Sequence, residues 1–251
     1  MWINYRPHPC PSKNESVMKE RYPVVFLSLG PGDPELLTLK AVKVLREADV
    51  VMVPASMKSG EIVRSRAADI IAEWCPADRQ QCYALPMMKD RRAAMEVYDR
   101  IFADVQAGYQ EGRRVVVAVE GDVSIYASIH YVLDRLSSAG VPVQQVPGIP
   151  SFIAAASVAN LSLVSGGQSM VVLPGNATPK QLEQLLATRH EVVVMKLSQC
   201  QDAVKRFLTA HDAVRCYYFE HVGTPDAFFS TDRTTILERP MPYFSLMVLK
   251  Q

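Results

Sequence analysis

The stretch "LSLGPGDPELLTLKA" (residues 27–41) decides the fold, because an apolar run, a turn with two glycines and a helix-like segment follow one another. The apolar run predicts a strand over residues 24–29. Both glycines allow backbone angles that other residues avoid, and Asp33 can cap the helix predicted over residues 35–47. A strand, a glycine turn and a helix in this order indicate an α/β protein.

The turn differs from the two glycine-rich turns that bind phosphate. A dinucleotide turn has a third glycine where this chain has Glu35, and a P-loop ends in Gly-Lys-Ser/Thr, which is missing here. Pro31 and Pro34 lack the N–H groups that would hold an anion, and the first lysine after the turn is Lys40. The sequence therefore argues against a phosphate site. It leaves open a plain strand–helix turn with a good cap.

Strands and helices alternate along the chain, which predicts two α/β lobes. Further strands are predicted over residues 49–53, 81–85, 114–119, 143–146, 169–173, 191–195 and 214–219. Further helices are predicted over residues 61–73, 91–110, 124–136, 151–159, 179–187 and 199–211. The end, "TTILERPMPYFSLMVLK", predicts two strands around a proline-broken turn, and so a mixed sheet in the second lobe.

The segment "SSAGVPV" (residues 137–143) is rich in small and turn residues, which indicates a linker. We therefore expect a polar, proline-rich N-terminal extension (residues 1–22), an N-terminal α/β domain (residues 23–136) and a C-terminal α/β domain (residues 137–251). The strand over residues 143–146 would open the second domain.

Composition excludes several classes of protein. A net charge of +1 over 251 residues gives no basic surface for nucleic acid. The apolar runs are strand-sized and predict no membrane span, and the N-terminus lacks the apolar region of a secretory signal. The five cysteines are odd in number and form no C-x-x-C pair, so neither a disulfide framework nor a zinc site is expected. A reducing cytoplasm fits this pattern.

Two more glycine turns follow predicted strands. Glu120-Gly121-Asp122 comes after the strand over residues 114–119, and "PGIPS" (residues 147–151) opens an alanine-rich helix. Ligands of open α/β sheets bind at the carboxyl ends of strands, which is where these turns lie. Asp122 and Ser151 can also act only as helix caps. Taken together, the three turns predict a ligand cleft between the lobes.

Three segments carry a resemblance to a known family: "LGPGDPELLTLKAVKVLREADVV", "EGDVSIY" and "VPGIPSFIAAAS", in this order and spacing. They resemble the tetrapyrrole methylases, which are S-adenosylmethionine-dependent enzymes of cobalamin and sirohaem synthesis. "GDVSIY" and the C-terminal "MPYFSLMVL" resemble the precorrin-2 C20-methyltransferase branch, which includes cobalt-factor II enzymes. The resemblance implies two α/β/α lobes with a cofactor and substrate cleft between them, and a homodimer.

The resemblance also implies which residues bind the cofactor, position by position. These are Pro31, Glu120, Gly121, Asp122, Ile125, Pro150, Ser151, Met195, Lys196, Val222 and Gly223. The sulfonium centre of S-adenosylmethionine is cationic, so we expect carbonyl oxygens rather than N–H groups to face it. A proline-rich turn without a lysine suits that polarity.

The chain departs from the family pattern at three positions. Lys196 replaces the glycine that follows Met195, and Val123 replaces a proline of the second turn. Pro54 stands where uroporphyrinogen-methylating relatives carry an aspartate proposed as a base, so no carboxylate base is carried over at that position.

These residues lead to a hypothesis of methyl transfer to the C20 bridge carbon of precorrin-2 or cobalt-factor II. C20 must then lose a proton, and Tyr126 and Asp122 are the candidate catalytic residues, with a substrate carboxylate or water as alternatives. Arg91 and Arg92 could pair with substrate carboxylates or form a solvated helix end. Any cobalt would arrive within the substrate, and no protein metal site is expected.

Three other functions stay open at this point. The chain could be a methylase of the same family acting on another corrin position. It could act on diphthamide or ribosomal RNA, although the neutral charge argues against RNA. It could also be a non-catalytic protein that binds a tetrapyrrole.

Overall fold

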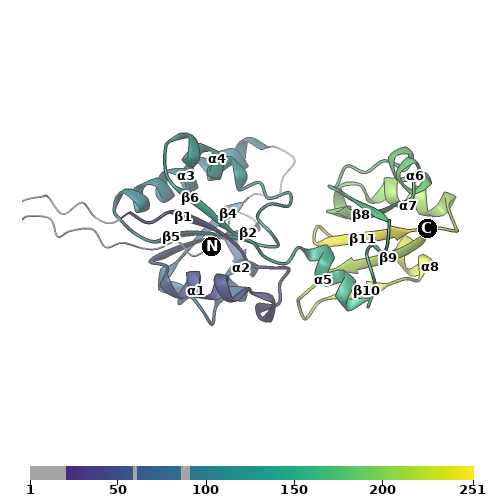
Figure 1. Ribbon diagram of the computed structural model, residues 1–251, viewed down its shortest axis with the longest axis horizontal. Coiled ribbons are helices and arrows are strands. Elements are labelled where there is room, and N and C mark those ends of the chain that lie inside the picture. The colour runs from purple at the N-terminus through teal and green to yellow at the C-terminus, as the bar shows by residue number, and fades with distance from the viewer. Residues whose placement is uncertain (1–20, 59–60, 86–90) are drawn as a thin grey trace, which may run out of the picture.

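The computed structural model describes residues 21–58, 61–85 and 91–251 of the chain. Nearly all of the predicted N-terminal extension lies outside these residues. Figure 1 shows two lobes beside each other, each built from a sheet with helices on both faces. This confirms the predicted architecture of two α/β/α lobes.

The sheet of the first lobe has the strand order β3-β2-β5-β1-β6, with β4 also paired to β2. Its strands are β1 (Val24–Ser28), β2 (Val50–Lys58), β3 (Glu61–Arg64), β4 (Gln80–Leu85), β5 (Val115–Val119) and β6 (Val143–Val146). The described pairs are parallel except for β2–β3. Because β1 lies between β5 and β6, the carboxyl ends of these three strands meet at one edge of the sheet.

Alternate side chains of the strands pack into two helix layers, as the period of a strand requires. Phe26 of β1 faces α3 (Arg91–Gln110) and α4 (His130–Ser138). Leu27 faces α1 (Leu39–Glu47) and α2 (Arg66–Ile71). The layers lie on opposite sides of the sheet (Figure 1).

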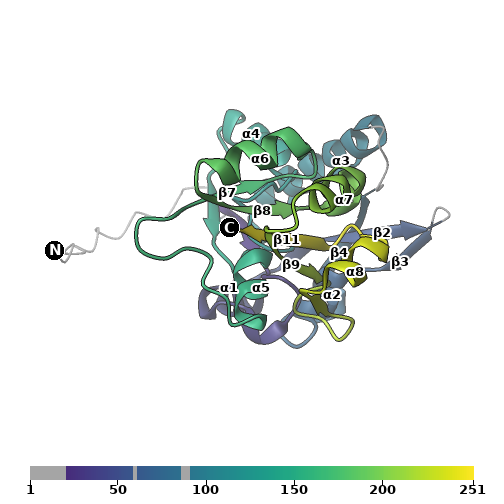
Figure 2. The same cartoon turned by 90° about the vertical axis from the view of Figure 1, so that its right-hand side faces the viewer.

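The second sheet has the order β10-β9-β11-β8-β7. Its strands are β7 (Ser169–Leu173), β8 (His190–Met195), β9 (Arg215–Glu220), β10 (Phe228–Ser230) and β11 (Ser245–Lys250). β11 runs antiparallel to both neighbours while β7 and β8 are parallel, which confirms the predicted mixed sheet. Figure 2 shows α6 (Pro179–Ala187) and α7 (Gln201–Ala210) on one face and α5 (Ser151–Val158) on the other.

Capping residues divide two segments that were predicted as single helices. In the segment 35–47, Thr38 accepts a hydrogen bond from the Ala41 N–H at 3.1 Å, so α1 begins at Leu39 after a short 3-10 helix. In the segment 61–73, Ser65 caps α2 through the Ala68 N–H at 3.0 Å, and the residues before it form β3.

The helix predicted over residues 124–136 also starts late, at His130. Tyr126 has a positive φ of 51°, which is incompatible with a right-handed helix at this point. Strand β2 runs through Pro54, where it was predicted to stop, and the Pro54 carbonyl accepts a hydrogen bond from the Ser65 hydroxyl at 2.7 Å.

Two predictions about the second half are wrong. The strand β6 does not open the second lobe, because it pairs in parallel with β1 of the first sheet. We propose to divide the chain in the turn after Val146 instead of at 136/137. The predicted C-terminal hairpin is a helix followed by a strand: α8 (Arg233–Glu238) is capped by Asp232, buries Ile236 and precedes β11.

Two leucines on α1 provide a matched test of this packing. Leu45 is 0% exposed and Leu39 is 90% exposed. We expect Leu45→Ala to lower the free energy of unfolding by about 2–5 kcal/mol, because it leaves a cavity under the sheet. Leu39→Ala should change it by less than about 0.5 kcal/mol. Urea denaturation of both variants measures this, and equal effects would contradict the burial described here.

Candidate functional site

The three glycine turns meet at the edge of the first sheet. Gly30 and Gly121 exchange two backbone hydrogen bonds, with N···O distances of 3.0 and 2.7 Å. Both residues have positive φ, which glycine adopts readily. The third turn joins them through the Gly148 N–H, which donates to Asp122 Oδ2 at 2.7 Å. A Cβ on Gly148 would lie 2.6 Å from the Ser28 Cβ, so this position requires glycine.

Asp122 is the centre of this arrangement. Its Oδ2 also accepts from the Ser28 hydroxyl at 3.4 Å, and its Oδ1 accepts from the N–H and the hydroxyl of Ser124. Burial raises the pKa of the Asp122 carboxyl, but the hydrogen bonds from Gly148, Ser124 and Ser28 outweigh it and hold the pKa below its usual range. A carboxylate with its lone pairs occupied in this way positions the turns and is poorly suited to accept another proton.

A cavity of about 300 Å³ lies between the lobes and opens beside these turns. Every residue predicted to bind the cofactor lines it, except Gly223: Pro31, Glu120, Gly121, Asp122, Ile125, Pro150, Ser151, Met195, Lys196 and Val222. Tyr126 lines it as well. The predicted positions are therefore brought together from both lobes.

Gly223 lies against the first turn. Its φ is 79°, and a Cβ there would be 2.9 Å from the Asp33 nitrogen and 3.2 Å from the Gly32 nitrogen. This close approach brings the two lobes into contact and is possible only for glycine.

Arg66 is a cavity residue that the sequence analysis missed. Its Nη2 donates to the Pro31 carbonyl at 3.2 Å and its Nε lies 3.5 Å from Glu120 Oε2. Its guanidinium stands 4.0 Å from the ring centroid of Phe244, which belongs to the second lobe. Among the described residues its buried Nη1 has no hydrogen-bond partner. One side chain therefore links two cofactor turns to the other lobe.

Glu120 and Pro31 turn oxygen atoms toward this cation. Burial raises the pKa of Glu120, and the positive charge of Arg66 offsets part of that effect. The Pro31 carbonyl is already a hydrogen-bond acceptor for a positive group. Arg66 therefore already compensates the negative charge and the carbonyl dipole on this wall of the cavity.

Tyr126 and Lys196 connect the lobes on another side of the cavity. The Tyr126 hydroxyl donates to the Val172 carbonyl at 2.6 Å, and Lys196 Nζ donates to the Tyr126 carbonyl at 3.2 Å. Tyr126 is 42% exposed, so it stands at the mouth of the cavity. Its hydroxyl is held as a donor, which favours a positioning role.

The remaining walls are largely apolar and aromatic. They include Met52, Tyr83, Tyr98, Ile101, Val117, Tyr243, Phe244 and Leu246. Tyr83 donates to Asp104 at 2.7 Å, and burial together with this bond raises the pKa of Tyr83. Arg92 is exposed and does not line the cavity, and nothing is described of the Arg91 side chain.

The described part of the chain holds neither a metal-binding cluster nor a membrane-spanning helix. No three histidine, cysteine, aspartate or glutamate side chains within it gather closely enough to hold a metal ion. None of its helices is both long and apolar enough to cross a membrane.

Replacing Asp122 by asparagine tests its central role. An amide can accept at only one atom, so at neutral pH we expect D122N to lower the free energy of unfolding by about 1–3 kcal/mol. Folding lowers the pKa of Asp122. The ionised carboxyl therefore stabilises the fold above its pKa in the unfolded chain, near about 4, and this stabilisation is lost as pH falls through the lower pKa of the folded protein. The difference in the free energy of unfolding between wild type and D122N should therefore shrink at acid pH.

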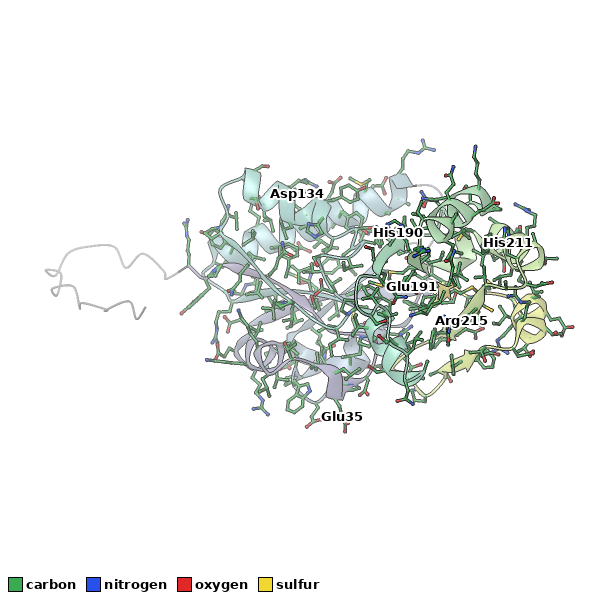
Figure 3. All side chains as sticks on the ribbon, turned by 45° about the vertical axis from the view of Figure 1, so that its right-hand side comes forward. Glu35, Asp134, His190, Glu191, His211 and Arg215 are labelled. Carbon is green, nitrogen blue, oxygen red and sulfur yellow. The ribbon has the colours of Figure 1, made fainter. Side chains whose placement is uncertain are left out.

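Urea denaturation between neutral pH and pH about 3 measures this difference. The control is D134N, because Asp134 is exposed on the outer side of α4 (Figure 3). A difference for D122N that is independent of pH would contradict the assignment.

The chain is similar to known proteins over most of its length. The family model described as tetrapyrrole (corrin/porphyrin) methylases matches residues 23–236. The chain is 31% identical to the precorrin-2 C(20)-methyltransferase of Sinorhizobium sp, over 90% of this chain and 94% of that protein. It is 31% identical to the probable cobalt-precorrin-2 C(20)-methyltransferase of Methanocaldococcus jannaschii, over 69% and 71%.

A solved structure shows the same fold. Uroporphyrin-III C-methyl transferase from Thermus thermophilus, in complex with S-adenosyl homocysteine, superposes with a TM-score of 0.63 at 20% identity, over 92% of this chain and 98% of that chain. The extent of the family match, the two lobes and the cavity between them lead to one conclusion: the chain belongs to the tetrapyrrole (corrin/porphyrin) methylase family.

Proposed function

We propose that the chain transfers a methyl group from S-adenosylmethionine to C20 of precorrin-2 or its cobalt form, in cobalamin biosynthesis. The observation that carries this is the cavity, since both segments that resemble the C20 branch line it. "GDVSIY" contributes Asp122 and Tyr126, and "MPYFSLMVL" contributes Tyr243 and Phe244. The two relatives named as C(20)-methyltransferases support the same substrate class.

The cavity fits the proposed cofactor. Predicted cofactor positions from both lobes line it, and its apolar walls suit the uncharged part of the molecule. When bound, the cofactor supplies an electrophilic methyl group. The chain's residues hold the three turns in place, keep the macrocycle next to that methyl group and exclude water.

Proton removal from C20 needs an acceptor after the new C–C bond has formed. Asp122 is saturated with hydrogen bonds, Glu120 is paired with Arg66, and the Tyr126 hydroxyl is held as a donor. We therefore propose that Asp122 and Tyr126 position the site. The proton then passes to a substrate carboxylate or to water.

Labelled methyl transfer tests the proposal. Anaerobic reactions with methyl-labelled S-adenosylmethionine should place label at C20 of precorrin-2 or cobalt-factor II, as located by NMR. Uroporphyrinogen III is the control macrocycle and should stay unlabelled, because Pro54 replaces the aspartate of its methylases. Label at another carbon would contradict the C20 assignment. Macrocycle binding without any label would favour a non-catalytic binding protein.

We further propose that the enzyme is a homodimer that pairs through α5. This helix is apolar apart from Ser151 and Ser157, yet Ile153 and Val158 are 43% and 57% exposed on it. A helix of that kind is normally buried, and a second copy of the chain would cover it. Figure 1 places α5 at the junction of the lobes.

The double variant I153E/V158E tests this interface. We expect wild type to sediment as a dimer at micromolar concentration and the variant as a monomer, because two charges would have to be buried at the contact. K180E is the control, since Lys180 is exposed on α6. A wild-type protein that sediments as a monomer would contradict the proposal.

We also propose a cytoplasmic location. The four described cysteines, Cys75, Cys82, Cys200 and Cys216, are free thiols, as a reducing compartment would keep them.

A further inference from the structure

Lys196 adopts a backbone conformation that favours glycine. Its φ and ψ are 56° and 48°, in the left-handed region that side chains with a Cβ rarely occupy. It follows the end of β8, and its carbonyl packs so closely on Gly175 that a Cβ there would lie 2.6 Å away. Non-glycine residues held in this region concentrate at functional sites. The lysine side chain is therefore a candidate for a role that glycine could not fill.

The ammonium group of Lys196 faces the cavity without an anionic partner. Nζ donates to the Tyr126 carbonyl at 3.2 Å, and no ion pair with it occurs among the described residues. The two acidic side chains that line the cavity are already engaged, Glu120 with Arg66 and Asp122 with Gly148 and Ser124. Burial lowers the pKa of Lys196, as expected of a partly desolvated cation without a compensating charge.

We propose that Lys196 binds a carboxylate of the macrocycle, from one of its acetate or propionate side chains. An ammonium group has three donors, and the bond to Tyr126 uses one of them. A carboxylate at the cavity mouth would accept the others and neutralise the charge. The inference rests on the proposed function, because that function brings a macrocycle with several carboxylates into the cavity.

The macrocycle is a better source of this carboxylate than the methionine end of the cofactor. Tyr126, whose carbonyl accepts the hydrogen bond from Lys196, stands at the partly exposed mouth of the cavity. The three turns proposed to hold the cofactor lie at the edge of the first sheet, whereas Lys196 reaches in from the second lobe. The family resemblance implies a cofactor contact at Lys196; we assign its side chain to the substrate instead, which it would hold from the lobe opposite those turns.

Replacing Lys196 by glycine or methionine separates folding from binding. Glycine relaxes the left-handed backbone, so K196G should unfold at a urea concentration no lower than wild type. The dissociation constant for cobalt-factor II, followed anaerobically by its absorbance, should rise about tenfold to a hundredfold in K196G and K196M. The dissociation constant for S-adenosyl homocysteine should stay within about twofold of wild type.

Two controls accompany these variants. K196R keeps the positive charge and should retain most of the affinity for cobalt-factor II. K180M removes an equal charge from the outer surface of the second lobe and should leave both dissociation constants unchanged.

Three outcomes would overturn the inference. If K196M binds cobalt-factor II as tightly as wild type does, Lys196 is not a substrate anchor, and the proposed function is unaffected. If the Lys196 variants lose affinity only for S-adenosyl homocysteine, the carboxylate that Lys196 binds is that of the cofactor. If wild type itself binds no macrocycle, the proposed function fails together with the inference.

Discussion

The carboxylate of Asp122 is the contact on which the rest of the site depends. It accepts hydrogen bonds from Gly148, Ser124 and Ser28, which belong to or follow three different strands. Because β5, β1 and β6 are neighbours in a parallel sheet, their turns emerge at one edge, and a single buried anion can fix all three. These turns in turn position the helices that follow them in the chain. One wall of the cavity is therefore set by a short polar network and not by apolar packing.

The sequence predicted this network's parts because each turn obeys local rules. Glycines after an apolar run and an aspartate at a helix start identify a strand–helix turn without any knowledge of its neighbours. Which strands pair is a non-local property, and so β6 was assigned to the wrong lobe. The place of Arg66 in the cavity was not predicted for a related reason. The residues of β3 and α2 together have the pattern of one helix, and only the cap at Ser65 separates them. Tyr243 and Phe244 belong to a motif that the sequence shows, but their place in the cavity is also a non-local property, and the segment before them was predicted as a strand where α8 forms.

Each lobe has cores of its own, and Leu36 and Ile125 of the first lobe pack against one core of the second. The links at the cavity are polar or involve single side chains: Tyr126 to Val172, Lys196 to Tyr126, and Arg66 against Phe244. Gly32 and Gly223 add one close backbone approach. Such a junction resists displacement less than a packed core does. A ligand that fills the cavity touches both lobes and so contributes to holding their relative orientation.

The position of β11 has a consequence for how the chain is made. This last strand lies between β8 and β9, and all six of its residues are buried. Until Lys250 has left the ribosome, the second sheet lacks its middle strand, and no strand joins β8 to β9. The first sheet is complete once Val146 has emerged. The nascent chain therefore carries a finished first lobe for about a hundred residues of further synthesis, at a rate of roughly 5–20 residues per second, before the second can close. During that interval the apolar strands of the second lobe are the part of the chain most in need of a chaperone.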